Sequence, residues 1–170
     1  MWKQLQMTKI LFVCHGNICR SPMAEFIMKQ LVKKANRQDE FFIESAATST
    51  EEIGNPVYPP AQRALKLHGI DANGKTARQM TFRDFEKFHY IVLMDKNNLR
   101  NLRGILPRGI YDKECLPKMN APFSRRLQKV SLLLDYTENP RDVADPWYTG
   151  DFETTWNDIL DGCKCLLSIL

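Results

Sequence analysis

The fold is decided by the stretch Lys9-Ile10-Leu11-Phe12-Val13-Cys14-His15-Gly16-Asn17-Ile18-Cys19-Arg20-Ser21-Pro22. It opens on a short, mostly apolar run, which is typical of a strand buried on both faces. A turn containing Gly16 and Asn17 follows, and then Ser21 and Pro22 fit the cap and the first position of a helix. Apolar residues after Pro22 recur at helical spacing. The stretch therefore predicts a strand, a phosphate-sized turn and a helix.

The rest of the chain alternates in the same way. Strands are predicted at 41–45, 90–94 and 130–134, and helices near 58–68, 81–87, 96–103 and 122–128 and over 152–170. This alternation predicts an α/β fold with a parallel sheet and helices on both faces. The chain has no internal repeat or long linker, so residues 1–170 are expected to form a single domain. Ligands of such sheets bind beyond the carboxyl ends of the strands, where residues 14–21 would fall.

Composition narrows the function classes. The 170 residues are 44% hydrophobic and 26% charged, with five cysteines at irregular positions that suit a reducing compartment better than a disulfide framework. The start of the chain is too polar for a signal peptide, and the apolar run at 10–13 is too short to span a membrane. A cytoplasmic protein without a membrane partner is expected. The net charge is +4, but the positive residues are scattered among acidic ones and form no stripe, so no nucleic acid partner is expected.

The loop 14–21 contains the pattern C-x5-R, whose spacing suits an anion of phosphate size. Its backbone N–H groups can curl round the anion, Gly16 and Asn17 can take the unusual dihedral angles that this requires, and the next helix presents its positive end. The same field should favour the thiolate of Cys14 near neutral pH. The pattern predicts an anion cup with a charged nucleophile.

Two neighbours complete the predicted chemistry of this loop. Arg20 offers a planar fork that can hold two phosphate oxygens. Ser21 can donate its hydroxyl to the Cys14 sulfur, which steadies the thiolate as nucleophile and as leaving group. The alternative is that Cys14 is a buried strand-end cysteine and the glycine a simple turn. A Gly-Lys-Ser/Thr ending is missing, which argues against a nucleotide-binding P-loop.

A distant aspartate is the candidate acid. Asp145 stands in the loop Asp145-Pro146-Trp147-Tyr148, whose proline restricts the backbone and whose aromatics can flank an aryl substrate. A carboxylic acid that protonates the leaving oxygen typically contributes about 10²–10⁴-fold to such a reaction. The alternatives are that Asp145 is a turn residue before the last helix and that Trp147 and Tyr148 are ordinary surface or core aromatics.

The segment Val13 to Pro22 resembles the signature of the low-molecular-weight protein-tyrosine phosphatases. The similarity extends over essentially the whole chain, through Ser45-Ala46, His68-Gly69-Ile70, Ala77-Arg78-Gln79, Met94-Asp95 and Asp145-Pro146-Trp147-Tyr148. The resemblance implies a flavodoxin-like sheet of four strands in the order 2-1-3-4. It also implies metal-independent hydrolysis of phosphotyrosine or aryl phosphates, without a cofactor. Cys14 would form a phosphocysteine, and Asp145 would act first as acid and then as base.

The resemblance also implies a set of substrate-binding residues, with phosphate or a similar oxyanion in the loop and a phosphotyrosine-containing protein or aryl phosphate as substrate. These residues are His15, Gly16, Asn17, Ile18, Cys19, Ser21, Glu51, Trp147 and Tyr148. In the family the second loop cysteine, here Cys19, is a resolving partner that protects the nucleophile from overoxidation. A small packed hydrophobe is the alternative for Cys19. Spacing of the Cys and His residues predicts no metal site.

Two positions depart from the family pattern. Glu51 stands where many relatives have an aromatic on the cleft rim, so acidic phosphopeptides are expected to be disfavoured. Lys75 stands where many relatives have a histidine that supports the loop asparagine, so Asn17 is expected to need another partner. Two rivals stay open: a thioredoxin-coupled arsenate reductase, which needs a further mobile cysteine pair where Cys115 stands alone, and a non-enzymatic phosphate- or phosphopeptide-binding module.

Overall fold

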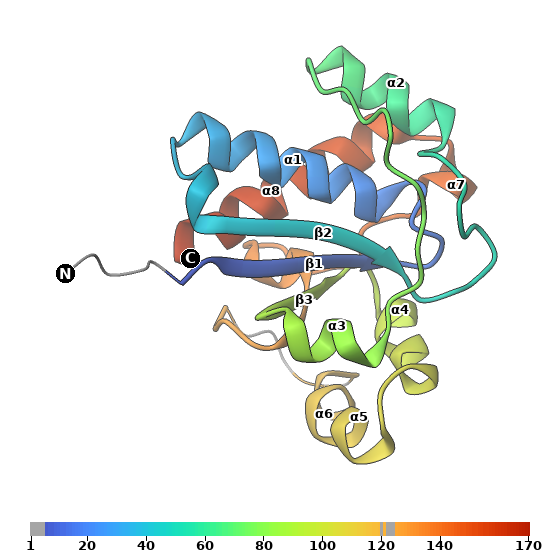
Figure 1. The fold of residues 1–170 in the computed structure, drawn as a ribbon, viewed down its shortest axis with the longest axis vertical. Coiled ribbons are helices and arrows are strands. Elements are labelled where there is room, and N and C mark those ends of the chain that lie inside the picture. Colours follow the sequence, from blue (N-terminus) through green and yellow to red (C-terminus); the bar gives the residue numbers. More distant parts are fainter. Residues whose placement is uncertain (1–5, 120, 122–124) are drawn as a thin grey trace.

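The computed structural model describes residues 6–119, 121 and 125–170 (Figure 1). Its sheet consists of β1 (Thr8–Cys14), β2 (Phe41–Ala47), β3 (Tyr90–Leu93) and β4 (Val130–Leu132). All pairings are parallel, in the order β2-β1-β3-β4. The predicted α/β class, the strand positions and the order 2-1-3-4 are therefore confirmed. β4 is shorter than predicted because a 3-10 helix, Leu133–Tyr136, begins directly after it.

The central strand β1 is buried on both faces, as its apolar run predicts. Ile10 and Phe12 belong to one hydrophobic cluster, and Leu11 and Val13 belong to the cluster on the other face. Side chains of a strand alternate between its faces, so every residue of this run finds an apolar partner layer. β1 pairs with β2 and with β3, which brings the carboxyl ends of three parallel strands to one edge.

Helices cover both faces of the sheet, as predicted. One face carries α1 (Arg20–Lys34), α2 (Pro59–Leu67) and α8 (Phe152–Ile169). The other face carries α3 (Phe82–Lys87), α4 (Lys96–Asn101), α5 (Arg108–Glu114) and α6 (Leu116–Met119), as Figure 1 shows. Short elements complete the chain: α7 (Pro146–Thr149) and 3-10 helices at Gln38–Glu40 and Leu102–Gly104. No helix of the described part of the chain is long and apolar enough to cross a membrane.

The helix predicted at 122–128 is wrong where it can be judged. Residues 122–124 lie outside the described residues, and 125–128 contain no helix. The helical segments of this region come earlier, as α5 and α6. Pro107 is the N-cap of α5, and Tyr111 and Cys115 at helical spacing turn into the core.

The predicted start of α1 is also corrected. The N-cap is Cys19 and the helix begins at Arg20, so Ser21 lies inside the first turn. The Ser21 hydroxyl does not cap the helix. It lies 3.0 Å from the Cys14 sulfur, the partner that the sequence predicts for it.

Candidate active site

The cup lies where β1 ends and α1 begins, at the carboxyl edge of the sheet. Asn17 has a left-handed backbone, with φ of 58°, so it makes the unusual bend of the loop. Gly16 has no positive φ; a Cβ at this position would meet the Glu52 side chain at 3.4 Å. That distance is an ordinary van der Waals contact, so neither the dihedral angles nor close packing requires glycine at residue 16. That part of the prediction is corrected.

Cys14 forms the floor of a cleft. Its side chain is buried, and its sulfur lies 3.0 Å from Ser21 Oγ and 3.3 Å from the Asn17 backbone N–H. The cleft brings together nearly all the predicted site residues: its lining is Cys14, His15, Gly16, Ile18, Cys19, Arg20, Glu51, Glu52, Asp145, Trp147 and Tyr148. Asn17 and Ser21 lie behind it. Glu52 was not predicted, although it directly follows Glu51.

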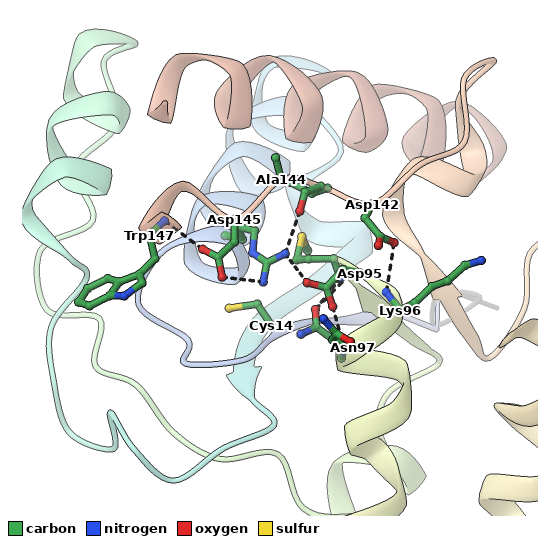
Figure 2. Close-up of polar contacts among 12 residues, drawn as sticks. Cys14, Asp95, Lys96, Asn97, Asp142, Ala144, Asp145 and Trp147 are labelled. Atoms are coloured by element: carbon green, nitrogen blue, oxygen red, sulfur yellow. Dashed lines mark hydrogen bonds and ion pairs between the residues drawn. The ribbon is translucent and has the colours of Figure 1, made fainter. Parts of the chain in front are cut away.

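Arg20 joins three parts of the chain. Its buried guanidinium donates from Nη1 to Asp95 Oδ2 at 2.7 Å and to the Val143 carbonyl at 2.8 Å. Nη2 donates to Asp145 Oδ2 at 3.2 Å. Figure 2 shows Asp95 and Asp145 reaching this centre from two sides, with Cys14 beside them. These three contacts fix the orientation of the guanidinium.

The charge of Arg20 is secured by its surroundings. Burial opposes the charged form, but the negative charges of Cys14, Asp95 and Asp145 outweigh it and raise the pKa of the guanidinium. Asp95 has no role in the sequence prediction, although a signal was present. It follows β3, the neighbour of β1, after a single residue, and residues at the ends of adjacent parallel strands meet at one edge.

Asp145 is both a turn residue and a cleft residue. Its Oδ1 accepts from the Trp147 backbone N–H at 3.0 Å, which makes it the N-cap of α7, while Oδ2 faces Arg20. Gly150, with φ of 71°, ends α7 in a left-handed C-cap. The cap holds the carboxylate beside the guanidinium. Asp145 can therefore be a turn residue and line the cleft at the same time.

The cleft lining contains both aromatic and acidic residues. Trp147 lies 4.9 Å from Tyr58, ring centroid to ring centroid, and Tyr148 is 85% exposed. The exposed side chain of His15 also lines the cleft, and its Nε2 lies 3.1 Å from Glu51 Oε2. Glu51 is thus an exposed member of the lining that contacts the residue after Cys14.

Asn17 is supported without a histidine, as expected. Its amide Nδ2 donates to Ser21 Oγ at 2.8 Å and to Ser45 Oγ at 2.9 Å, and its Oδ1 accepts from the Arg78 backbone N–H at 3.2 Å. Lys75 does not touch Asn17. Its ammonium donates to the Ser45 carbonyl at 2.9 Å, and the hydroxyl of the same serine is a partner of Asn17.

Cys19 is a buried thiol in the same loop as Cys14. All five cysteines are free. Burial raises the pKa of Cys19, and the negative charges of Cys14 and Asp145 raise it further. The Cys19 thiol is therefore protonated near neutral pH. Within the described residues no three His, Cys, Asp or Glu side chains are grouped so that they could hold a metal ion.

Comparisons with known proteins agree with this geometry. Residues 9–170 match the family described as low molecular weight phosphotyrosine protein phosphatase. The chain is 38% identical over 164 residues to the low molecular weight protein-tyrosine-phosphatase YfkJ of Bacillus subtilis, covering 95% of each chain. It is 39% identical over 165 residues to the human low molecular weight phosphotyrosine protein phosphatase, covering 95% of this chain and 96% of the relative.

Solved structures give the same result. The crystal structure of YfkJ from Bacillus subtilis aligns with a TM-score of 0.82 at 37% identity, over 96% of this chain and 94% of the other. The structure described as DARP, Drosophila arginine phosphatase, aligns with a TM-score of 0.76 at 32% identity, over 95% of this chain and 97% of the other.

Proposed function

The chain belongs to the low molecular weight phosphotyrosine protein phosphatases, and on that premise we propose that it hydrolyses phosphotyrosine in proteins, and aryl phosphates, through a phosphocysteine on Cys14. One observation carries the proposal. The Cys14 sulfur, the Arg20 guanidinium and the Asp145 carboxylate, from opposite ends of the chain, line one cleft at the edge of the sheet.

In the first step the Cys14 thiolate attacks phosphorus and the bond to the tyrosine oxygen breaks. Asp145, as the carboxylic acid, gives its proton to that oxygen, so tyrosine leaves neutral. Arg20 and the loop N–H groups hold the phosphoryl oxygens as their charge is redistributed. This step yields tyrosine and a phosphocysteine.

In the second step Asp145, now a carboxylate, takes a proton from water as the water oxygen attacks phosphorus. The sulfur–phosphorus bond breaks, which releases inorganic phosphate and restores the Cys14 thiolate. The Ser21 hydroxyl, 3.0 Å from the sulfur, supports the thiolate as a leaving group. No external oxidant, reductant or metal enters this balance.

Selectivity follows from the walls of the cleft. The sulfur lies at a buried floor, while Ile18, Trp147 and Tyr148 line the way to it. A long flat phenyl ring can reach the floor and contact apolar walls, whereas phosphoserine is short. Glu51 and Glu52 add negative charge at the mouth, which disfavours acidic flanking residues in the substrate.

The test is an assay of the purified protein with a chelator present. Phosphotyrosine peptide should be hydrolysed faster than phosphoserine peptide. Phosphoarginine is included because a similar structure is described as an arginine phosphatase, and arsenate with thioredoxin tests the reductase alternative. A preference for phosphoarginine or reduction of arsenate would replace the proposed substrate.

Variants test the mechanism. Cys14→Ser should abolish turnover, and Asp145→Ala should slow it by about 10²–10⁴-fold. Asp142→Ala is the matched control, because Asp142 accepts from the Lys96 backbone N–H and is not part of the cleft lining. Turnover by Cys14→Ser, or an equal loss in Asp142→Ala, would contradict the assigned roles.

We also propose that residues 1–170 work as one domain, since the family match spans 9–170. A cytoplasmic location remains part of the proposal, because five free thiols suit a reducing compartment. Cell fractionation with an antibody against the chain tests the location.

A further inference from the structure

A largely buried lysine lies behind the cup and is not part of the cleft lining. The side chain of Lys75 is 14% exposed, and its ammonium donates to the Ser45 carbonyl at 2.9 Å. It also lies 3.6 Å from Oε1 of Glu25, whose carboxylate is buried in α1. Lys29 approaches the other Glu25 oxygen at 3.7 Å, but its side chain is 47% exposed. Lys75 is therefore the better-buried counter-charge of Glu25.

The carboxylate of Glu25 determines which groups donate and which accept in a series of hydrogen bonds. An ionised carboxylate only accepts, so the Ser45 hydroxyl donates to Glu25 Oε1 at 3.4 Å. The same hydroxyl oxygen accepts from Asn17 Nδ2 at 2.9 Å. The orientation of the Asn17 amide is fixed independently, since the Arg78 backbone N–H must meet its Oδ1. Asn17 is thus a donor on the side that faces the two serines.

The donor and acceptor roles in this network determine whether the Ser21 hydroxyl donates or accepts. Its hydroxyl oxygen accepts from Asn17 Nδ2 at 2.8 Å, and its own hydrogen is available to donate. Two acceptors are within reach: the Cys14 sulfur at 3.0 Å and the Ala46 carbonyl at 3.4 Å. A hydrogen bond to a thiolate is charge-assisted, and this contact is also the shorter one. The series therefore ends with Ser21 donating to the nucleophile.

We propose that Lys75 is a positioning residue which, together with Glu25, fixes Ser45 at its carbonyl and its hydroxyl and so holds Asn17 and Ser21 against the Cys14 sulfur. Lys75 itself does not line the cleft. The effect on turnover rests on the proposed function, whereas the effect on the Cys14 thiolate does not.

Loss of Lys75 acts on the thiolate in two ways. Glu25 keeps a buried negative charge with only a half-exposed partner, and such a charge disfavours a second anion nearby. The Ser45 carbonyl also loses its donor, so the serine is held at one point instead of two. The other charges that face Lys75 are Arg78 and Glu44. Burial lowers the pKa of the Lys75 ammonium, and Glu25 opposes that shift.

The experiment compares Lys75→Met, which keeps length and loses charge, with Lys75→Arg, which keeps the cation. The first readout is the pH midpoint of Cys14 alkylation by iodoacetamide, followed by peptide mass mapping. We expect the midpoint to rise in Lys75→Met and to stay near wild type in Lys75→Arg. With p-nitrophenyl phosphate, kcat should fall about tenfold in Lys75→Met while KM changes little.

Lys118→Met is the matched control. Lys118 is also partly buried and donates to a backbone carbonyl, that of Glu114, but it lies on α6 away from the cup. It should leave the alkylation midpoint unchanged. Circular dichroism confirms folding of each variant. If Lys75→Met does not fold, Lys75→Gln, which loses the charge but keeps an N–H donor, tests the effect of the charge alone, and the midpoint should again rise.

A double variant tests the route of the effect. If Lys75 acts through Ser21, then Lys75→Met should shift the midpoint far less in a Ser21→Ala background than in wild type. An unchanged midpoint and kcat in folded Lys75→Met would overturn the proposal, as would equal shifts in Lys118→Met or full additivity with Ser21→Ala. Because alkylation needs no turnover, the result stands even if phosphotyrosine is not the substrate.

Discussion

Cys14 and Cys19 are both buried in the same short loop, yet their sulfurs have different partners. The Cys14 sulfur faces the Ser21 hydroxyl and the Asn17 N–H. The pKa of the Cys19 thiol is raised, first by burial and then by the negative charge of Cys14. Peroxide should therefore oxidise Cys14 first, because the thiolate is the reactive form.

This arrangement predicts a self-limiting oxidation. Peroxide converts the Cys14 thiolate to a sulfenic acid, which removes a negative charge that raises the pKa of Cys19. The Cys19 thiol, now easier to deprotonate, attacks the Cys14 sulfur, forms a disulfide and releases water. We expect mild peroxide to give a Cys14–Cys19 bridge that a thiol reductant reverses, and formation of the bridge to be faster as the pH rises.

In Cys19→Ser the same treatment should drive Cys14 to irreversible sulfinic and sulfonic acids, as peptide mass mapping can show. Cys115→Ser is the control, because Cys115 is buried in the cluster on the other face of the sheet. Persistent Cys14 sulfonate without a bridge in the unmodified chain would contradict a resolving role for Cys19.

At the scale of elements, α8 approaches the 3-10 helix Leu133–Tyr136 through Gly162. A Cβ at this glycine would lie 2.5 Å from Leu133 Cγ and 3.0 Å from Cδ1. Gly162→Ala should lower the free energy of unfolding by about 1–3 kcal/mol, because overpacking outweighs the gain in helix propensity. Urea denaturation measures the change.

Gly109→Ala in α5 is the opposite case and serves as the control. A Cβ at Gly109 meets nothing within 4 Å. Alanine there should raise the free energy of unfolding, by up to about 1 kcal/mol. If the two variants shifted stability in the same direction, close packing at Gly162 would not be the cause.

The elements differ in how well the sequence predicts them. β1 was predictable because its continuous apolar run has one physical solution, burial on both faces between two parallel neighbours. α5 was not predicted: Gly109 is unfavourable in a helix, whereas Pro107 marks a helix start and Tyr111 and Cys115 supply the apolar spacing. These local signals conflict, and the packing of Tyr111 and Cys115 in the core favours the helix.

The site shows the same division. The cup was predictable because its residues are contiguous, and each has a chemical reason to be there. Asp145 could be linked to the cup only through the resemblance, since spacing along the chain says nothing of a contact so distant in sequence. Asp95 and Glu25 were missed because their roles are pairings with Arg20 and Lys75, which exist only in the fold.

At the scale of the whole molecule, two acids with shifted pKa values, the buried Asp84 and the partly buried Asp135, act on stability in opposite directions. Burial raises the pKa of Asp135, and Asp142 adds to that shift. Burial also opposes the charge of Asp84, but hydrogen bonds from Arg78 and Thr81 outweigh it and lower the pKa. The charged form of Asp135 thus costs stability in the native state, whereas that of Asp84 contributes stability.

The pH dependence follows from these signs. Between pH 3.8 and the raised pKa of Asp135, the native state binds more protons than the unfolded state. The destabilisation caused by the charged Asp135 therefore appears as pH rises through that range. Asp135→Asn should therefore raise the denaturation midpoint at neutral pH, with a gain that vanishes below 3.8.

Asp84→Asn should do the reverse. The stability that Asp84 contributes is present above its ordinary pKa of 3.8 and is lost as pH falls through its lowered value. The variant should be less stable at neutral pH, and its deficit should shrink in acid. Denaturant titrations across the acid range measure both curves; parallel curves for the two variants would contradict the assigned signs.

The path of the chain through the active site has a consequence for biosynthesis. Cys14 is synthesised long before Asp145 and before the helix α8, which packs on α1. A ribosome-bound chain therefore carries Cys14 for some time without Asp145. If the proposed roles hold, we expect catalysis to begin only after Asp145 and α8 have left the exit tunnel, so that synthesis itself delays the appearance of activity.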